Sequence, residues 1–184
     1  MKTFREFLEE GNKLWRNVEK PLSQGKEIGT VSYERGGMNR SAKSKARKSM
    51  EADLQRLRKT GAISGFKKAK GRYQYAEPKP GEQGEGGVSA EKSYVVKQGE
   101  GRKAKYFPKI LQALGNRYGQ ESTMRVKKDK RASYIYSKGD VEPVGKVRYN
   151  IPLGKEVDGE KVRGDTRLGG QSFTAVNDTN KKGK

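Results

Sequence analysis

The sequence contains no cysteine and no histidine among its 184 residues. Without cysteine the chain cannot form a disulfide or offer a thiolate to a metal ion. Without histidine it also lacks the commonest neutral metal ligand and the commonest general base. Any catalysis must therefore depend on Asp, Glu, Lys, Tyr or Ser, and the sequence predicts neither a metal site nor a cofactor.

Long hydrophobic runs are also missing. No apolar stretch approaches the roughly 20 residues that span a bilayer, and the first residues are amphipathic rather than uniformly apolar. Hydrophobic residues make up 30% of the chain and glycine occupies 24 positions. This composition suffices for one modest core of roughly 100 residues with flexible flanks. We therefore expect a single soluble domain with no membrane partner.

Acidic residues are scarce relative to basic ones. The chain has 22 Asp and Glu against 42 Lys and Arg, which gives a formal net charge of +20. A surplus of this size attracts polyanions, because lysine and arginine displace the counterions that condense on phosphates. Nucleic acid is the partner that this charge favours.

Three segments have the apolar spacing of helices. Residues 2–20 carry an amphipathic stripe, which Gly11 interrupts and Pro21 ends, so one helix and two shorter helices are equally expected. Residues 39–60 are the clearest case, because apolar residues recur three and four positions apart after Asn39, a suitable N-cap. A third helix is expected from about residue 105 to 118.

Short runs rich in β-forming residues alternate with these helices. Their order predicts an α+β fold: a small antiparallel or mixed sheet with two helices on one face, similar to a split βαβ arrangement. An N-terminal amphipathic helix precedes the sheet, and an extended C-terminal tail follows it. Within the tail, a hairpin is expected around Asp158 and Gly159. The expected strands are 27–33, 63–67, 72–75, 92–97, 123–127 and 132–136.

Composition shifts divide the chain into segments. Residues 27–139 are expected to form the basic α+β domain, interrupted at 77–90 by a flexible acidic, Gly-rich loop. Residues 11–26 are interpreted as a helix and linker, and residues 140–184 as an extended, partly flexible tail. Residues 1–10 form a separate peptide with its own pattern.

That peptide and the residue after it read MKTFREFLEEG. The segment resembles the capsid-targeting peptide of the internal head proteins of T-even-type tailed phages, which begins Met-Lys-Thr-aromatic-x-Glu-Phe-Ile/Leu-x-Glu. In that family the peptide takes the protein into the prohead, and the maturation protease cuts after Leu/Ile-x-Glu. The resemblance implies a cleavage site at Leu8, Glu10 and Gly11. The alternative is an amphipathic helix that docks on the following domain.

Two blocks of the body are similar to a family of uncharacterised domains from bacteria and phages. The first reads TVSYERGGMNRSAKSKARKSMEADLQRLRKTG, and the second combines EKSYVV with ALGNRYGQES. The structural alternative, which we favour, assigns the matching polar residues to a helix cap, a strand edge and a turn. By position, the resemblance implies a possible shared pocket formed by Asn39, Glu91, Ser93 and Gln120.

Basic residues that can contact phosphate occur in three groups. Lysine and arginine position a nucleic acid without reading its sequence, so non-specific binding is expected. The candidates are Arg40, Lys43, Lys45, Arg47 and Lys48 on the second helix, then Lys67, Lys68, Lys70 and Arg72, and finally Arg102, Lys103 and Lys105.

These observations predict a non-enzymatic internal virion protein that enters the phage head, is cut by the prohead protease and binds DNA non-specifically. Its expected partners are packaged double-stranded DNA, the prohead scaffold and the maturation protease, with a host protein after ejection. Its expected locations are the virion and, during assembly or after ejection, the host cytoplasm. Two alternatives remain open: an inhibitor of a host defence enzyme, and a small nuclease or transferase.

Overall fold

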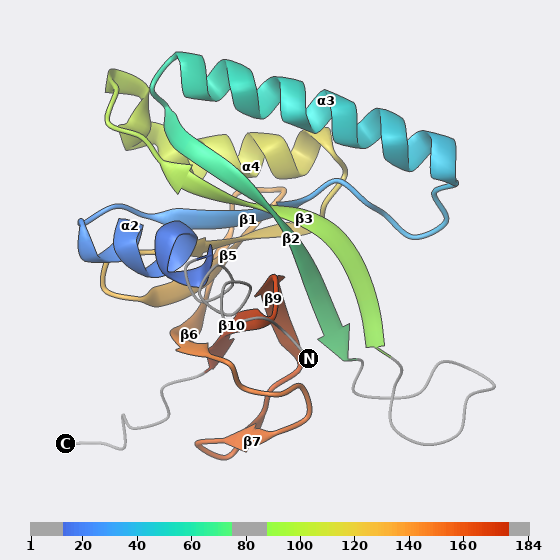
Figure 1. The fold of residues 1–184 in the computed structure, drawn as a ribbon, viewed down its shortest axis with the longest axis vertical. Helices are drawn as coiled ribbons and strands as arrows, with labels where there is room; N and C mark the ends of the chain where they lie inside the picture. Colours follow the sequence, from blue (N-terminus) through green and yellow to red (C-terminus); the bar gives the residue numbers. More distant parts are fainter. Residues whose placement is uncertain (1–12, 75–87, 177–184) are drawn as a thin grey trace, which may run out of the picture.

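The computed structural model describes residues 13–74 and 88–176. Within them, eight strands form a closed antiparallel barrel in the order β1-β3-β2-β9-β10-β6-β5-β4, and β1 pairs with β4 to close it (Figure 1). The barrel strands are β1 (Ile28–Ser32), β2 (Ile63–Gln74), β3 (Val88–Gln98), β4 (Ser122–Val126), β5 (Arg131–Tyr136), β6 (Val141–Tyr149), β9 (Gly164–Leu168) and β10 (Gln171–Val176).

Two helices lie on the outside of the barrel wall, where Figure 1 shows them side by side. They are α3 (Arg40–Lys59) and α4 (Phe107–Arg117), and the 3₁₀ turn η2 (Arg102–Tyr106) leads into α4. The smaller elements are the π-helical turn η1 (Trp15–Glu19), α2 (Lys20–Ser23), and a hairpin of β7 (Glu156–Val157) and β8 (Glu160–Lys161).

In residues 13–74 and 88–176, no helix combines the length and apolar character needed to cross a membrane.

The barrel strands contribute to two separate cores, because successive residues of a strand point to opposite faces. On β3, Tyr94 and Val96 pack with side chains of α3 and α4 between the wall and the helices. Val95, between them, belongs to a second core inside the barrel. The inner core consists of Ile28, Val95, Met124, Val126, Ala132, Val147, Leu168 and Phe173, with Leu14, Val18 and Leu22 from the N-terminal helical segment packed against it.

The predicted fold class was wrong: the protein is a barrel, and not a small sheet with two helices on one face. The expected extended tail was the source of the error. Its strands β6, β9 and β10 complete the wall, because β9 pairs with β2 and β6 pairs with β5. The two helices that were expected to cover the sheet do pack on one side of this closed wall.

Several local predictions are confirmed. The side chain of Asn39 accepts a hydrogen bond from the backbone N–H of Ala42 at 2.8 Å, so it caps α3 as expected. The hairpin at Asp158 and Gly159 is present, and both residues have positive φ, which is typical of a two-residue type I′ turn. One local prediction was wrong: the strands expected at 63–67 and 72–75 are one continuous strand, β2.

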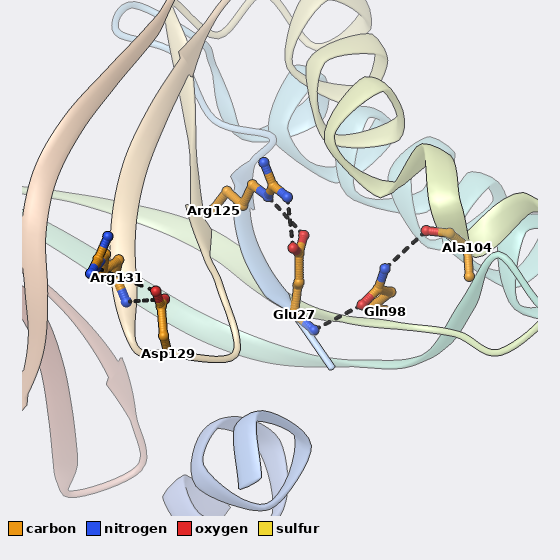
Figure 2. Close-up of polar contacts among 6 residues, drawn as sticks. All are labelled: Glu27, Gln98, Ala104, Arg125, Asp129 and Arg131. Carbon is orange, nitrogen blue, oxygen red and sulfur yellow. Dashed lines mark hydrogen bonds and ion pairs between the residues drawn. The ribbon is translucent and has the colours of Figure 1, made fainter. Parts of the chain in front are cut away.

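Polar side chains hold the seam where β1 joins its two neighbours, as Figure 2 shows. The carboxylate of Glu27 accepts two hydrogen bonds from Arg125 on β4, at 2.7 and 2.6 Å. The backbone N–H of Glu27 donates to Gln98 at the end of β3, and Gln98 in turn donates to the carbonyl of Ala104. One short segment before β1 is thereby bonded to both β3 and β4, which fixes the closure of the barrel.

A close approach between α4 and β1 makes Gly29 a sensitive position. A Cβ atom there would lie 2.5 Å from both terminal methyl carbons of Leu111, which is fully buried. Gly29→Ala is therefore expected to lower the free energy of unfolding by about 1–3 kcal/mol, because the core must shift to admit the methyl group. Urea denaturation measures the change. Gly36→Ala, where nothing lies within 4 Å, is the control, and equal stability of the two variants would contradict the packing argument.

Candidate active site

One end of the barrel is hollow, and the hollow forms a cavity of about 880 Å³. All eight barrel strands contribute to its wall, and the segment from Glu160 to Arg163 borders it as well. The volume lies within the range of about 300–1,000 Å³ that is usual for small-molecule sites. The mouth of a barrel is also a common position for such sites.

The cavity begins where the inner core ends. Met124 and Phe173 belong to the inner core and also line the cavity, so they form an apolar floor. On β3, the alternation that places Val95 in the core places Ser93 and Glu91 on the same inner face, in successively more open positions. Ser93 is buried, and its hydroxyl has no hydrogen-bond partner in the described structure.

Three tyrosines contribute to the cavity wall: Tyr73 from β2, and Tyr134 and Tyr136 from β5. Burial raises the pKa of Tyr134, and the nearby groups Tyr73 and Glu142 raise it further. The hydrogen bond that Tyr136 donates to Glu142 raises the pKa of Tyr136 to about 12. Tyr134 and Tyr136 therefore stay neutral at physiological pH and present aromatic rings to a ligand.

The charge balance of the cavity differs from that of the chain. Four acidic and three basic side chains line it, a formal charge of −1, whereas the whole chain carries +20. Glu91 is exposed at this wall, and its carboxylate makes no hydrogen bond or ion pair within the described ranges. The acidic residues are Glu91, Glu121, Glu160 and Asp165, and the basic residues are Arg72, Lys161 and Arg163.

Arg72 and Asp165 form a bidentate ion pair across the β2–β9 junction. Arg72 Nε donates to one carboxylate oxygen of Asp165 at 2.9 Å, and a terminal guanidinium nitrogen donates to the other. The side chain of Asp165 is fully buried and that of Arg72 is 23% exposed. The hydrogen bonds to Asp165 raise the pKa of the Arg72 guanidinium. The pair neutralises itself, so the charge of the cavity is set by the other three acidic and two basic side chains that line it.

Gln120 lies at the wall and also ties two loops together. Its side-chain nitrogen donates to the carbonyl of Glu34, beyond the end of β1, at 3.0 Å. The carboxylate of Glu34 accepts from the backbone N–H of Lys92 at 3.0 Å. These bonds connect the segments before β4 and after β1 to β3 beside the cavity.

The structure brings together three of the four residues that were considered for a shared pocket. Glu91, Ser93 and Gln120 all line the cavity, whereas Asn39 caps α3 outside it. Whether the three contact a ligand stays a prediction. The described residues contain no group of three or more acidic side chains that could hold a metal ion.

The basic candidates lie on separate elements, and only Arg72 lines the cavity. Arg40, Lys43, Lys45, Arg47 and Lys48 lie on α3, while Arg102, Lys103 and Lys105 lie in η2. Lys67, Lys68 and Lys70 lie on β2, where Lys68 forms an ion pair with Glu51 of α3 at 3.2 Å. The proposed cleavage residues Leu8, Glu10 and Gly11 fall outside the described residues.

Comparison with known families decides between the interpretations of the sequence. The family model described as the S-adenosylmethionine lyase family matches residues 29–176, from the first barrel strand to the last. This chain belongs to that family. A search of curated proteins found no significant match.

The S-adenosylmethionine lyase family is a family of enzymes, so several predictions from the sequence were wrong. The chain is not assigned to the phage internal head proteins or to an uncharacterised domain family, and the interpretation as a non-enzymatic DNA-binding virion protein fails. That interpretation depended on about ten N-terminal residues and on net charge, and neither feature indicates what the barrel binds. The expected contacts with DNA, prohead scaffold, maturation protease and host protein are untested and stay predictions, as does the virion location.

Sequence reasoning missed the tyrosines as cavity residues. Tyr73 falls in the expected strand 72–75, and Tyr134 and Tyr136 fall in the expected strand 132–136, and both strands were assigned to a sheet without a site. The alternation of side chains along a strand could have found them. Tyr134 and Tyr136 share a face of β5 with the core residue Ala132. In the same way, Ser93 and Glu91 share a face of β3 with the core residue Val95.

Proposed function

We propose that this protein is an enzyme that cleaves S-adenosylmethionine in the barrel cavity by a lyase reaction. The observation that carries the proposal is the family membership, together with a cavity whose charge suits this substrate. At neutral pH, S-adenosylmethionine carries a sulfonium, an ammonium and a carboxylate, so its net charge is positive. A cavity with a formal charge of −1 attracts such a cation even though the chain as a whole is strongly basic.

The aromatic side chains suit the sulfonium as well. The face of an aromatic ring attracts a cation through its quadrupole, by about 0.5–2 kcal/mol depending on how far the pair is removed from water. Tyr73, Tyr134 and Tyr136 present such rings, and Glu91 adds a carboxylate on the adjacent strand. A sulfonium held between them is favoured over a neutral thioether of the same shape.

A lyase breaks the carbon–sulfur bond without water or an oxidant. The bonding electrons leave with sulfur, so the sulfonium becomes the neutral thioether 5′-methylthioadenosine. The carbon that is left needs a new bond. In an elimination, the electrons of a neighbouring C–H bond form a double bond to this carbon while the proton goes to a base. In a ring closure, the carboxylate oxygen of the substrate itself attacks this carbon and closes a five-membered lactone.

Ring closure fits this cavity better than proton removal. The hydrogen next to the reacting carbon is not activated, and the carboxylates that line the cavity are weak bases toward it. Ring closure needs no protein base, because the nucleophile belongs to the substrate. The cavity then has to fold the amino-acid chain of the substrate, hold the sulfonium and exclude water, and positioning of this kind lowers a barrier substantially.

Incubation of the purified protein with S-adenosylmethionine tests the proposal, with Gly71→Val as the matched cavity-blocking variant. A Cβ at Gly71 would lie no closer than 3.9 Å to its neighbours, the Glu91 carbonyl and the Ser93 hydroxyl, so valine fits the strand but fills the cavity. We expect the wild type to release 5′-methylthioadenosine, measured by chromatography, and the variant to be at least about tenfold slower.

Proton NMR of the same mixture distinguishes the lactone from an alkene product. A reaction without protein provides the background, and unfolding midpoints within a few degrees of each other show that the valine has left the fold intact. Equal rates with wild type, variant and buffer would show that the cavity does not cleave this substrate.

A further inference from the structure

The hydroxyl of Ser93 is the most unusual polar group at the cavity. Ser93 is 5% exposed, and its Oγ is buried without a hydrogen-bond partner among the described residues. An unpaired buried hydroxyl destabilises the protein, because it has lost its hydrogen bonds to water and gained none in return. Its partner across the strand pair, Ser32, shows the ordinary arrangement, because the Ser32 hydroxyl donates to the carbonyl of Lys92 at 3.1 Å. The cost at Ser93 is removed if a bound molecule supplies the partner.

The surroundings of Ser93 suit a flat and largely apolar group. Met124 and Phe173 form the apolar floor of the cavity, and the Ser93 hydroxyl lies 3.9 Å from the position of a Cβ at Gly71, inside the barrel. A purine ring has two apolar faces and an edge of nitrogen atoms that accept and donate hydrogen bonds. An apolar floor beside one unpaired hydroxyl matches both features.

The charged part of the substrate fits the opposite end. Glu91 lies two residues from Ser93 on the same face of β3, about 7 Å along the strand. Glu91 is exposed whereas Ser93 is buried, so the carboxylate is at the mouth and the hydroxyl at the floor. A sulfonium or ammonium loses less hydration at the mouth than at the floor, where burial of a charge is costly.

We infer that Ser93 is a binding residue that hydrogen-bonds the edge of the purine ring at the floor of the cavity, while the amino-acid half of S-adenosylmethionine lies at the mouth beside Glu91. This assignment rests on the proposed function. It gives the substrate one direction in the cavity and assigns a separate part of the substrate to each of the two residues.

Binding of two ligands to the wild type and to three variants tests the direction in which the substrate lies. S-adenosylmethionine contains both halves, whereas 5′-methylthioadenosine keeps the purine and lacks the amino-acid chain and the positive charge. By isothermal titration calorimetry, Ser93→Ala is expected to weaken both ligands by a similar factor, about tenfold for one hydrogen bond to a buried group. Glu91→Gln is expected to weaken S-adenosylmethionine and to leave 5′-methylthioadenosine within about twofold of wild type. The heats are measured before appreciable turnover, while S-adenosylmethionine is still intact.

Ser133 provides a matched control on the same barrel. It is also a buried serine with an unpaired hydroxyl, 7% exposed, but it is not among the residues that line the cavity. Ser133→Ala is expected to bind both ligands as the wild type does. If Ser93→Ala weakens S-adenosylmethionine alone, or behaves like Ser133→Ala, the assignment of Ser93 to the purine is overturned while the proposed function stands. If the wild type binds neither ligand, the proposed function fails and the assignment fails with it.

Discussion

Glu91→Gln is expected to reduce cleavage of S-adenosylmethionine by roughly 100-fold, which corresponds to about 2.7 kcal/mol of lost transition-state and substrate stabilisation. Glutamine keeps the size of the side chain and removes only its charge. The structure gives that charge no other role, because Glu91 is exposed and its carboxylate makes no ion pair or hydrogen bond within residues 13–74 and 88–176. The rate of 5′-methylthioadenosine release measures the effect.

The unfolding midpoint of this variant is expected to match the wild type, for the same reason. Glu156→Gln is the appropriate control, because it makes the same change in net charge on β7, at a residue that does not line the cavity. Its rate is expected to stay within about twofold of wild type, since exposed charges outside the cavity are screened by salt. A Glu91→Gln enzyme that keeps half of its activity, or a Glu156→Gln enzyme that loses as much, would remove Glu91 from the proposed site.

Local sequence patterns predicted the elements whose stability is local. α3 begins one residue after Asn39, and the Asp158–Gly159 turn forms the expected hairpin. Both depend on side-chain or backbone preferences within a few residues. Barrel closure depends instead on pairs that are distant in sequence, such as Arg72 and Asp165, which are 93 residues apart. No periodicity within a segment indicates which distant segment it will pair with.

The tail was misjudged for a physical reason that is connected to the site. Its strands β9 and β10 bury Thr166, Ser172 and Thr174 as well as apolar residues. Both threonines line the hollow end of the barrel, where polar side chains are tolerated beside a cavity. The apolar alternation that identifies a strand is therefore weakest where the barrel is hollow. The polar side chains that line the cavity therefore also made this segment resemble a polar, extended tail.

Net charge misled the functional interpretation in a similar way. A value of +20 describes the whole chain, whereas the cavity is lined by four acidic and three basic side chains. The relevant residues come from segments far apart in the sequence, Glu91 on β3 and Asp165 on β9 for example. The pattern that placed Glu91, Ser93 and Gln120 in one pocket did select cavity residues, and their contact with substrate stays a prediction.

Asp165→Ala is expected to cause the largest loss of stability among the changes considered, about 3–5 kcal/mol in the free energy of unfolding. The side chain of Asp165 is fully buried and accepts two hydrogen bonds from Arg72, so its removal leaves a partly buried guanidinium without its partner. Because the pair joins β2 to β9 at the cavity wall, cleavage activity is expected to fall together with stability. Urea denaturation at neutral pH measures the first effect.

An exposed ion pair in the same barrel supplies the comparison. Arg131 and Asp129 pair across the β4–β5 turn at 3.3 Å, with side chains 68% and 47% exposed (Figure 2). Asp129→Ala is expected to cost no more than about 1 kcal/mol, because solvent screens the pair. The double variant Arg72→Met, Asp165→Leu is expected to recover much of the stability that Asp165→Ala loses, since it removes both charges from the wall. If the double variant is as unstable as Asp165→Ala, packing around Asp165 stabilises the β2–β9 junction and the unpaired charge does not explain the loss.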